Sequence, residues 1–525
     1  MRKQTKLVAV LSAAALLALG ASMTSFAATG WVEENGTWVY YDNDGYKVTD
    51  TWKKSVNNWF WLNSDGEMAV STIVEDEDNY YYVDENGAMV SNTWVQIENE
   101  DADGEDEPAY VWYYFQANGK AYKAGTSGTS FKTINGKKYA FDSEGQMLYG
   151  WVDGESNRVT GDDAWSQAGE YYYCGDENDG AQRTGWAQIH VIDETEDEED
   201  QDYWFYFGSN GKKVYADNGE REEKTINGHK YVFDNRGKML SKWVDELGTS
   251  SVVADPMATV ADYRYYTENV GNMKKGWFQV VPDKDVNKNA YDDEEVKWFY
   301  AKNDGTLYNS CIKTINGKKY AFNKDGEMIS GLAAILMDNQ DDTKIKEVVV
   351  IDEEKELKEF ASFDAAATKA NYDVYYFGDK NDGSMKLGNQ NVEVDGETYS
   401  FFFTKTGSKK GMGFGSNNNN TDNTYIYDKS GIYVHGRKAK ADSDLKYEAF
   451  SAMGVRMDTE DAKTQGGYLL NTSGSIMKNK KNVKDGNDMY ICTDKDGKVA
   501  YYGEDKCGSK EQQASSNKCA NHDAQ

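Results

Sequence analysis

Aromatic and polar positions alternate along most of this chain with a regular spacing. The first unit opens at Trp31 and continues seven residues later with a largely aromatic triplet that starts at Trp38, followed by a polar turn that contains Gly45. The second unit repeats this order, with Trp52 at the opening and a triplet from Trp59. Alternation of aromatic and β-branched residues with polar ones predicts strands, and Asn-Gly or Asp-Gly supplies the positive φ of a tight turn. Each unit of about 20 residues is therefore predicted to be a β-hairpin.

Twelve such units can be followed along the chain. The opening positions are Trp31, Trp52, Ile73, Trp94, Phe131, Trp151, Trp186, Glu223, Trp243, Trp277, Ile312 and Leu332. The triplets are predicted to start at Trp38, Trp59, Tyr80, Trp112, Lys138, Tyr171, Trp204, Lys230, Arg264, Trp298, Lys319 and Val374. Where opening and triplet lie further apart, the insertion falls in the loop of the hairpin, where extra length is tolerated. Since a lone hairpin is only marginally stable, its apolar face must be covered by the next one.

The units divide the chain into four parts. Arg2, Lys3 and Lys6 precede an apolar stretch over 7–20 and small residues before a cut after Ala27, so residues 1–27 are predicted to be a secretory signal. Residues 28–388 form the repeat region, 389–505 hold degenerate repeats, and 506–525 are predicted to be a disordered tail. Within these parts, 416–424 is predicted to be a flexible linker and 353–370 a short helix.

Composition and charge restrict the function. The chain has 38 Tyr and 14 Trp but only 3 Pro and 4 His, and its net charge is −31. Such an acidic chain repels nucleic acid and anionic membranes, so neither is an expected partner. Five cysteines are too few for a disulfide framework, although Cys507 and Cys519 could pair, and the absence of a Cys-x-x-Cys or a His pair argues against zinc.

The units resemble the cell-wall-binding (choline-binding) repeats of Gram-positive surface proteins. The features that carry this resemblance are Gly30-Trp31, Gly36 two residues before Trp38, and Trp59-Phe60-Trp61-Leu62 followed by Gly66 and Met68. The Lys-Thr-Ile-Asn-Gly-Lys-Lys-Tyr stretch at 132–139, which recurs at 224–231 (with His229) and 313–320, is closer to repeats of glucan-binding proteins and clostridial toxins. The resemblance covers 31–388 well. It implies an all-β solenoid with about three hairpins per turn and ligand sites at the hairpin junctions.

At such a junction, aromatic rings and sometimes a Met surround a choline headgroup. Ring faces are electron-rich, and a quaternary ammonium cannot donate hydrogen bonds, so an aromatic cage suits it. The resemblance places cages at the junction of units 1 and 2 and at those of units 6 and 7 and units 9 and 10: Trp31, Trp38, Tyr40, Trp52, Trp59, Trp61, Met68; Trp151, Tyr171, Trp186, Trp204; Trp243, Trp277, Trp298. For every one of these rings, core packing is the alternative interpretation.

Some triplets begin with a cation in place of an aromatic residue. Lys138, Lys230, Arg264 and Lys319 stand there, and Glu223 replaces an opening ring. A cation should repel choline, so these junctions are expected to be structural or to bind sugar. If three hairpins complete a turn, the lysines of units 5, 8 and 11 form one stripe and the acidic loops of units 4, 7 and 10 another. A further hypothesis is that the Lys-rich stripe contacts teichoic phosphates or acidic glycan.

The sequence favours binding over catalysis. The four histidines have no repeated Cys, Ser or Asp partner, and no nucleophile elbow is present. We therefore expect a secreted, non-catalytic protein at the cell surface or cell wall that needs no cofactor or metal and does not insert into a membrane. Its partner would be a cell-wall polymer that carries choline, teichoic acid or glycan. The alternative is an adhesin that binds glucan or host glycan.

Overall fold

In the computed structural model, the chain is almost entirely β-structure. The structure describes residues 29–508, apart from 100–101, 103–107, 126–127, 197–199, 218–220, 246–258, 361–370, 414–437, 453 and 455. The predicted signal over 1–27, the linker and Cys519 lie outside the described residues. Two compact units are formed, by residues 1–240 and 241–525.

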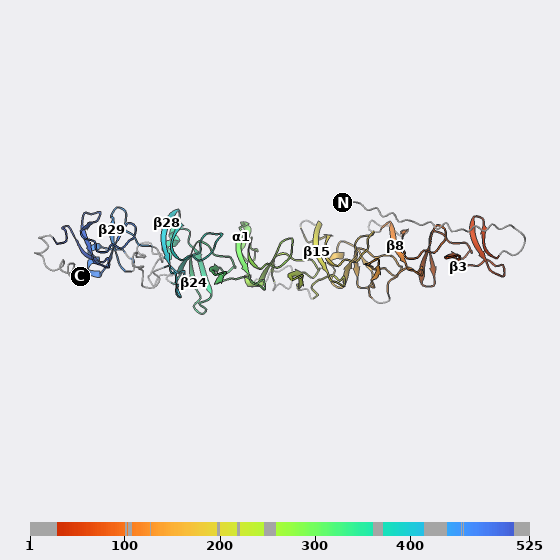
Figure 1. Cartoon of the computed structure of the whole chain (residues 1–525). Coiled ribbons are helices and arrows are strands. Elements are labelled where there is room, and N and C mark those ends of the chain that lie inside the picture. The colour runs from red at the N-terminus through yellow and green to blue at the C-terminus, as the bar shows by residue number, and fades with distance from the viewer. Residues whose placement is uncertain are drawn as a thin grey trace. The chain divides into compact units, whose positions relative to one another are not determined.

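The first unit consists of antiparallel hairpins in chain order (Figure 1). They are β1 (Gly30–Glu34) with β2 (Thr37–Tyr41), β3 (Thr51–Ser55) with β4 (Asn58–Leu62), β5 (Thr72–Asp76) with β6 (Asn79–Val83), β7 (Thr93–Glu98) with β8 (Tyr110–Phe115), and β9 (Lys132–Ile134) with β10 (Lys137–Tyr139). They continue with β11 (Trp151–Asp153) between β12 (Arg158–Val159) and β13 (Tyr171–Tyr173), β14 (Gly185–Ile192) with β15 (Asp200–Phe207), and β16 (Glu222–Ile226) with β17 (His229–Phe233). The 3-10 helix η1 (Ala164–Ser166) lies between β12 and β13.

The second unit continues the series with longer insertions. Its sheets are β18 (Lys242–Asp245) with β19 (Tyr263–Tyr266), β20 (Gly276–Val280) with β21 (Lys297–Ala301), β22 (Cys311–Ile315) with β23 (Lys318–Phe322), β24 (Leu332–Met337) between β25 (Ile345–Val350) and β26 (Asp373–Tyr376), and β27 (Gly388–Val394) with β28 (Glu397–Phe403). They end with β29 (Tyr447–Phe450) between β30 (Arg456–Met457) and β31 (Tyr468–Asn471), and β33 (Tyr490–Thr493) between β32 (Val483–Lys484) and β34 (Val499–Gly503). The short helices are η2 (Val260–Asp262), α1 (Lys288–Asp292), α2 (Glu354–Glu359) and α3 (Thr459–Gln465).

The polar turn after each triplet is shaped by one side chain. Asp84 Oδ1 accepts hydrogen bonds from the backbone N–H groups of Asn86, at 2.8 Å, and Ala88, at 2.9 Å. Asn63 does the same for Asp65 and Glu67. Asp and Asn favour such turns because their short side chains can reach the backbone two residues on. This explains why the repeat places Asp or Asn at this position.

A backbone hydrogen bond joins many of the hairpins to the next one in the same compact unit. The residue that follows the turn donates its N–H to the carbonyl of the first triplet residue of the preceding hairpin: Met68 to Trp38, Met89 to Trp59, Met147 to Trp112, Lys213 to Tyr171, Met239 to Trp204 and Met328 to Trp298, all at 2.8–2.9 Å. We call the donating position the slot residue. These bonds satisfy backbone groups that a lone hairpin would leave unpaired.

The structure confirms the predicted all-β fold of repeated hairpins. The predicted region of degenerate repeats also forms strands, from β27 to β34, and the insertion at 353–370 contains α2 over Glu354–Glu359. Cys174 and Cys492 are 0% and 1% exposed, as expected for small buried hydrophobic residues. Among the described residues no helix is long and apolar enough to cross a membrane. The number of hairpins per turn stays a prediction.

Candidate functional site

The strand register brings the opening residue of a unit and the first and third residues of its triplet onto one face. Trp31 pairs with Tyr40 across the first hairpin, and Trp52 pairs with Trp61 across the second. Directly opposed residues point to the same side, as do residues two positions apart. The opening residue and the first and third triplet residues therefore share a face, and the middle residue points away from it. Phe60, a middle residue, is only 6% exposed.

The opening ring of one hairpin packs edge-on against the middle ring of the next. The centroid of Trp31 lies 5.4 Å from that of Phe60, and the centroid of Trp52 lies 5.1 Å from that of Tyr81. Edge-to-face pairs are favoured because the ring edge is positive and the ring face negative. Each junction can thus hold four rings, three from one hairpin and one from the next.

A four-ring cluster of one composition recurs three times. It combines an opening Trp, a first-position Trp, a third-position Tyr and the middle Tyr of the next hairpin: Trp94, Trp112, Tyr114 and Tyr139; Trp186, Trp204, Tyr206 and Tyr231; Trp277, Trp298, Tyr300 and Tyr320. The two Trp centroids are 6.4, 6.3 and 6.3 Å apart. The opening Trp lies 5.1 Å from the third-position Tyr in every copy, and 4.9, 4.8 and 4.8 Å from the next hairpin's Tyr. The three rings of the first hairpin are all half-buried and keep some exposed surface.

Among the residues predicted for the junction of units 1 and 2, the centroid of Trp31 lies 5.4 Å from that of Tyr40, and the centroid of Trp52 lies 5.3 Å from that of Trp61. Trp59 is the most exposed of them, at 40%, and the Lys54 ammonium lies 5.8 Å from its centroid. Met68 donates its N–H to the carbonyl of Trp38, and its side chain lies against the turn of the following hairpin at Gly87. Met68 is thus positioned by the backbone bond that joins the two hairpins.

Two predicted residues, Trp186 and Trp204, form a cluster with the following hairpin, whereas the prediction placed them in a cage with the preceding one. Trp186 and Trp204 were assigned to the junction with the preceding hairpin, but their rings pack forward on Tyr231 of the next one, through Trp186. That next hairpin has Lys230 in its first triplet position, which we expected to repel a cationic ligand. Its ammonium instead lies 2.6 Å from a carboxylate oxygen of Glu223, so the charge is paired.

The triplet predicted to start at Arg264 is displaced by one residue. Trp243 pairs with Tyr265, which makes Tyr263 the first triplet residue and Arg264 the middle one. The centroids of Trp243 and Tyr263 are 6.5 Å apart with an interplanar angle of 75°, close to the arrangement of the Trp pairs above. The prediction was wrong because the insertion before β19 hid the true spacing. This junction is therefore aromatic rather than cationic.

A lysine lies in the predicted cage of Trp151 and Tyr171. The Nζ atom of Lys213 is 5.2 Å from the Trp151 centroid and 5.3 Å from the Tyr171 centroid. It also donates to the carbonyl oxygens of Trp165 at 3.0 Å, Gln167 at 2.8 Å and Arg236 at 2.9 Å. Lys213 is 4% exposed, and burial lowers its pKa to about 7. A basic group thus already lies between these two rings.

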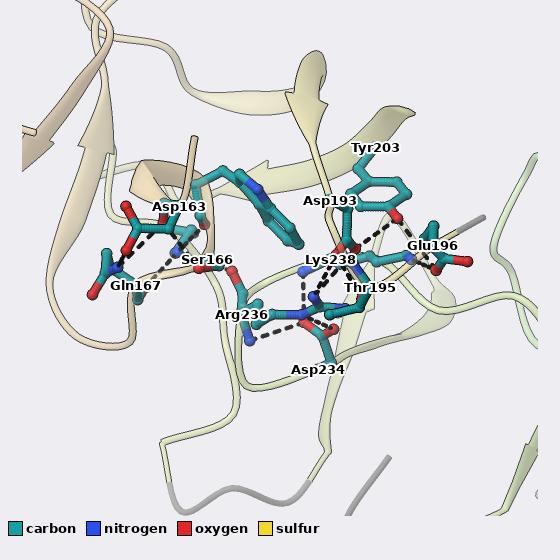
Figure 2. A network of polar contacts seen from close by, with 12 residues as sticks. Asp163, Ser166, Gln167, Asp193, Thr195, Glu196, Tyr203, Asp234, Arg236 and Lys238 are labelled. Atoms are coloured by element: carbon teal, nitrogen blue, oxygen red, sulfur yellow. Dashed lines mark hydrogen bonds and ion pairs between the residues drawn. The ribbon is translucent and has the colours of Figure 1, made fainter. Parts of the chain in front are cut away.

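Beside this lysine lies a polar network around Asp193 (Figure 2). Thr195 Oγ1 and Tyr203 Oη donate to its carboxylate at 2.6 and 2.9 Å, and Arg236 Nη1 lies 3.2 Å away. The Arg236 guanidinium also covers the ring of Trp165, 4.6 Å from its centroid. A pocket of about 440 Å³ borders this network and is lined by Asp162, Asp163, Trp165, Ser166, Ile192, Asp193, Glu194, Thr195 and Arg236. With these donors, Asp193 is suited to holding loops together rather than to acting as a general base.

Trp94 and Trp112 of the first recurring cluster were not among the predicted site residues. Their separation of 18 residues equals that of Trp186 and Trp204, so comparison of the insertions could have identified them. The third-position residues Tyr114, Tyr206 and Tyr300, which correspond to the predicted Tyr40, were not predicted either. Among the described residues, no group of three or more His, Cys, Asp or Glu is placed to hold a metal ion.

Comparison with known sequence families identifies the first repeats. Residues 28–73 match the choline-binding repeat, and residues 74–89 and 111–121 match the putative cell wall binding repeat. The resemblance found from the sequence is thereby confirmed for the hairpins β1 to β6 and for β8. Among curated proteins, Glucosyltransferase-S of Streptococcus mutans is 24% identical over 255 residues, which are 42% of this chain. The match spans 16% of that relative's length.

Several solved structures are also similar to this chain. Choline binding protein F from Streptococcus pneumoniae is 17% identical, with 74% of this chain and 99% of that chain covered and a TM-score of 0.33. The choline-binding domain of CbpL from the same species is 25% identical, with coverages of 47% and 98% and a TM-score of 0.28. The modular autolysin LytC, in complex with a synthetic peptidoglycan ligand, is 18% identical, with coverages of 59% and 55% and a TM-score of 0.30.

Proposed function

We propose that this chain, whose first hairpins carry choline-binding repeats, attaches non-covalently to a choline-bearing cell-wall polymer through aromatic cages between its hairpins. The match of residues 28–73 to the choline-binding repeat supports the ligand class. The observation that carries the proposal is the threefold recurrence of the four-ring cluster. Two nearly perpendicular Trp rings, with interplanar angles of 85°, 83° and 83°, present ring faces to a cation at each copy.

Each cage would bind choline only weakly. A cation–π contact contributes about 0.5–2 kcal/mol, so three rings give an affinity on the order of millimolar. A polymer with many headgroups can occupy several cages of one chain at once, and each further contact is then intramolecular. Such avidity makes a long series of weak junctions an effective anchor.

The test is retention of the mature chain on its own cell walls and elution by free choline. First-position Trp residues are the best targets, because they line the cages and are partly exposed, and we would replace Trp38, Trp59, Trp112, Trp204 and Trp298 by Ala together. We expect this variant to lose retention. Tyr46→Ala is the matched control, since Tyr46 is 72% exposed and lies in a turn outside the clusters. Unchanged retention of the five-Trp variant would refute the proposal.

A second candidate function is glycan binding, which a pocket beside Trp112 supports. This pocket has a volume of about 270 Å³ and is lined by Pro108, Tyr110, Val111, Trp112, Asp142, Gln146, Met147, Leu148, Tyr149, Arg158, Thr160 and Glu177. Aromatic rings next to planar polar groups can hold a sugar ring by stacking and hydrogen bonding. Elution by a soluble glucan but not by choline, lost in Gln146→Ala, would favour this function.

We further propose that the protein is secreted and acts at the cell surface without catalysing a reaction. The predicted signal over 1–27 supports secretion, and detection of a mature N-terminus near residue 28 in the extracellular or wall fraction would test it. The hydrogen bonds that Asp193 accepts from Thr195 and Tyr203 suit it to holding loops together, which supports a structural rather than a catalytic role for the region in Figure 2. Release of reducing sugar or soluble fragments from purified walls by the protein would contradict this part.

A further inference from the structure

The junction between β11/β13 and β14/β15 has a lysine, Lys213, as its slot residue. Met68, Met89, Met147, Met239, Met328 and Met385 fill this position at six other described junctions, whereas Ala121, Gln182, Gly413 and Lys438 fill it at four. The backbone is the same, since Lys213 donates its N–H to the Tyr171 carbonyl at 2.8 Å as Met68 does to Trp38. The side chain therefore starts from the usual place and carries an amine into the junction.

The surroundings of the Lys213 amine match a cation. Three carbonyl oxygens, those of Trp165, Gln167 and Arg236, accept from Nζ at 2.8–3.0 Å, and an ammonium has three N–H groups to donate where a neutral amine has two. The rings of Trp151 and Tyr171 lie at 5.2 and 5.3 Å, within the distance for cation–π attraction.

We propose that the Lys213 ammonium is a built-in ligand that occupies the Trp151–Tyr171 cage and closes this junction to external cations. Its carbonyl partners come from η1 and its C-terminal loop (Trp165 and Gln167) and from the turn after β17 (Arg236). The bound lysine therefore ties these segments to the hairpin β14/β15. The aliphatic part of the side chain also touches the turn at Gly237, where a Cβ atom would lie 2.9 Å from Lys213 Cδ. This inference rests on the proposed function only for the choice of choline as the probe.

The first experiment counts choline sites by equilibrium dialysis of the full mature chain at about pH 6, where Lys213, with its pKa of about 7, is protonated. Lys213→Met introduces the residue of the equivalent slots, and Lys212→Met is the matched control, because Lys212 is the neighbouring lysine and pairs at the surface with Glu170. We expect Lys213→Met to bind one more choline per chain than the wild type, and Lys212→Met to bind as many as the wild type. An equal count in Lys213→Met and Lys212→Met overturns the inference.

This design separates the inference from the proposed function. If the wild type binds no choline and Lys213→Met binds one, the closed junction is supported while anchoring by the other cages fails. If both bind choline and differ by one, both proposals are supported.

The second experiment uses the native chain alone, so it tests the enclosure of the Lys213 amine even if Lys213→Met does not fold. The native chain is acetylated with an N-hydroxysuccinimide ester, and the rate at each lysine is followed by mass spectrometry. Once the rates are corrected for the larger unprotonated fraction that the lowered pKa gives Lys213, we expect Lys213 to react on the order of tenfold or more slowly than Lys212, because its amine is buried. Choline at tens of millimolar, well above a millimolar Kd, should leave the Lys213 rate unchanged. Equal rates for both lysines, or faster acetylation of Lys213 with choline, would overturn the inference.

Discussion

At the scale of single residues, the slot position has opposite effects on a junction, depending on the side chain that fills it. The slot residue is an uncharged Met beside the open clusters and a lysine where a cage is filled from within. Because the backbone bond fixes where the side chain starts, one substitution changes the chemistry of a junction without changing the hairpin. Under the proposed function, differences in choline affinity between junctions would therefore depend on single side chains.

A single first-position Trp should have a measurable effect on ligand binding. Trp204→Ala removes one ring of a four-ring cluster, and the loss of one cation–π contact of about 0.5–2 kcal/mol corresponds to a roughly 2- to 30-fold weaker choline affinity at that junction. Choline titration followed by tryptophan fluorescence would measure it. Because Trp204 lies on the half-exposed face, the unfolding midpoint should change little. An unchanged affinity would show that this junction does not bind choline.

Lys213 should make stability depend on pH between about 7 and 10.5. Its folded pKa is lowered from 10.5 to about 7 by burial, and the carboxylate of Asp234 only partly opposes this. Between these values the unfolded chain keeps the proton that the folded chain has lost, so the free energy of unfolding rises with pH. We expect the wild type to gain on the order of 3 kcal/mol relative to Lys213→Met across this range. Denaturant unfolding of both proteins at several pH values measures the difference.

The comparison with Lys213→Met cancels the titration of distant groups. The nearby Asp234, Arg236 and Tyr171 are present in both proteins. A difference in free energy that is constant from pH 7 to 10.5 would contradict the lowered pKa.

At the scale of the hairpin, the close approach of neighbouring turns explains the turn glycines. Gly87 has φ +76°, and a Cβ atom there would lie 2.8 Å from Met68 Cε of the preceding hairpin. Gly36 has a similar φ of +85°, but a Cβ atom there would meet nothing within 4 Å. The first glycine is thus required by both backbone conformation and packing, the second by conformation alone.

Gly87→Ala should therefore destabilise the protein more than Gly36→Ala. A left-handed backbone costs a residue with a Cβ about 1–2 kcal/mol, which applies to both variants. The added Cβ atom would also lie 3.0 Å from the backbone oxygen of Ala69, which cannot move away as the Met68 side chain can, so crowding should add about 1 kcal/mol for Gly87→Ala. Thermal or denaturant unfolding of the two variants gives the comparison. An equal decrease in the free energy of unfolding for both variants would mean that the junction accommodates the added methyl group without strain.

The hairpins themselves could be predicted from the sequence, but their pairwise contacts could not. Aromatic triplets and Asp-Gly turns identify the strands because these signals are local. Arg264 was misplaced by one residue, since a long insertion removes the spacing that fixes the register. The position of Lys213 in a cage could not be predicted, because its partners Trp151, Trp165 and Arg236 belong to three different stretches of the chain. Such contacts depend on which loops meet, and the repeat pattern does not encode this.

At the scale of the whole molecule, the negative net charge of the chain has opposite effects on the two charged groups of a choline-bearing polymer. The chain carries a net charge of −31, which attracts choline but repels the phosphates of a teichoic acid. Several of its lysines are already paired, such as Lys137 with Asp179 at 2.9 Å and Lys230 with Glu223 at 2.6 Å. Long-range electrostatics should therefore oppose association with an anionic wall, and the cages must overcome this repulsion.

Retention on cell walls should consequently increase with salt. Raising the ionic strength from about 0.05 to 0.5 M shortens the Debye length from about 14 to 4 Å, which screens repulsion between distant charges more than contacts inside a cage. Wall pull-downs over this range would measure the bound fraction. Elution by salt would instead support the Lys-rich stripe as the contact with wall phosphates, and charge reversal of Lys132, Lys137 and Lys138 would then abolish retention.

The backbone bond between hairpins has a mechanical consequence. The carbonyl that accepts it and the first ring of the cage belong to the same residue, as at Trp204, which accepts from Met239. A pulling force that separates two hairpins would break this bond and dismantle the cage in the same event. In a protein anchored in this way under flow, the junctions would open one at a time. Every junction that closes again would restore its cage and could bind the ligand once more.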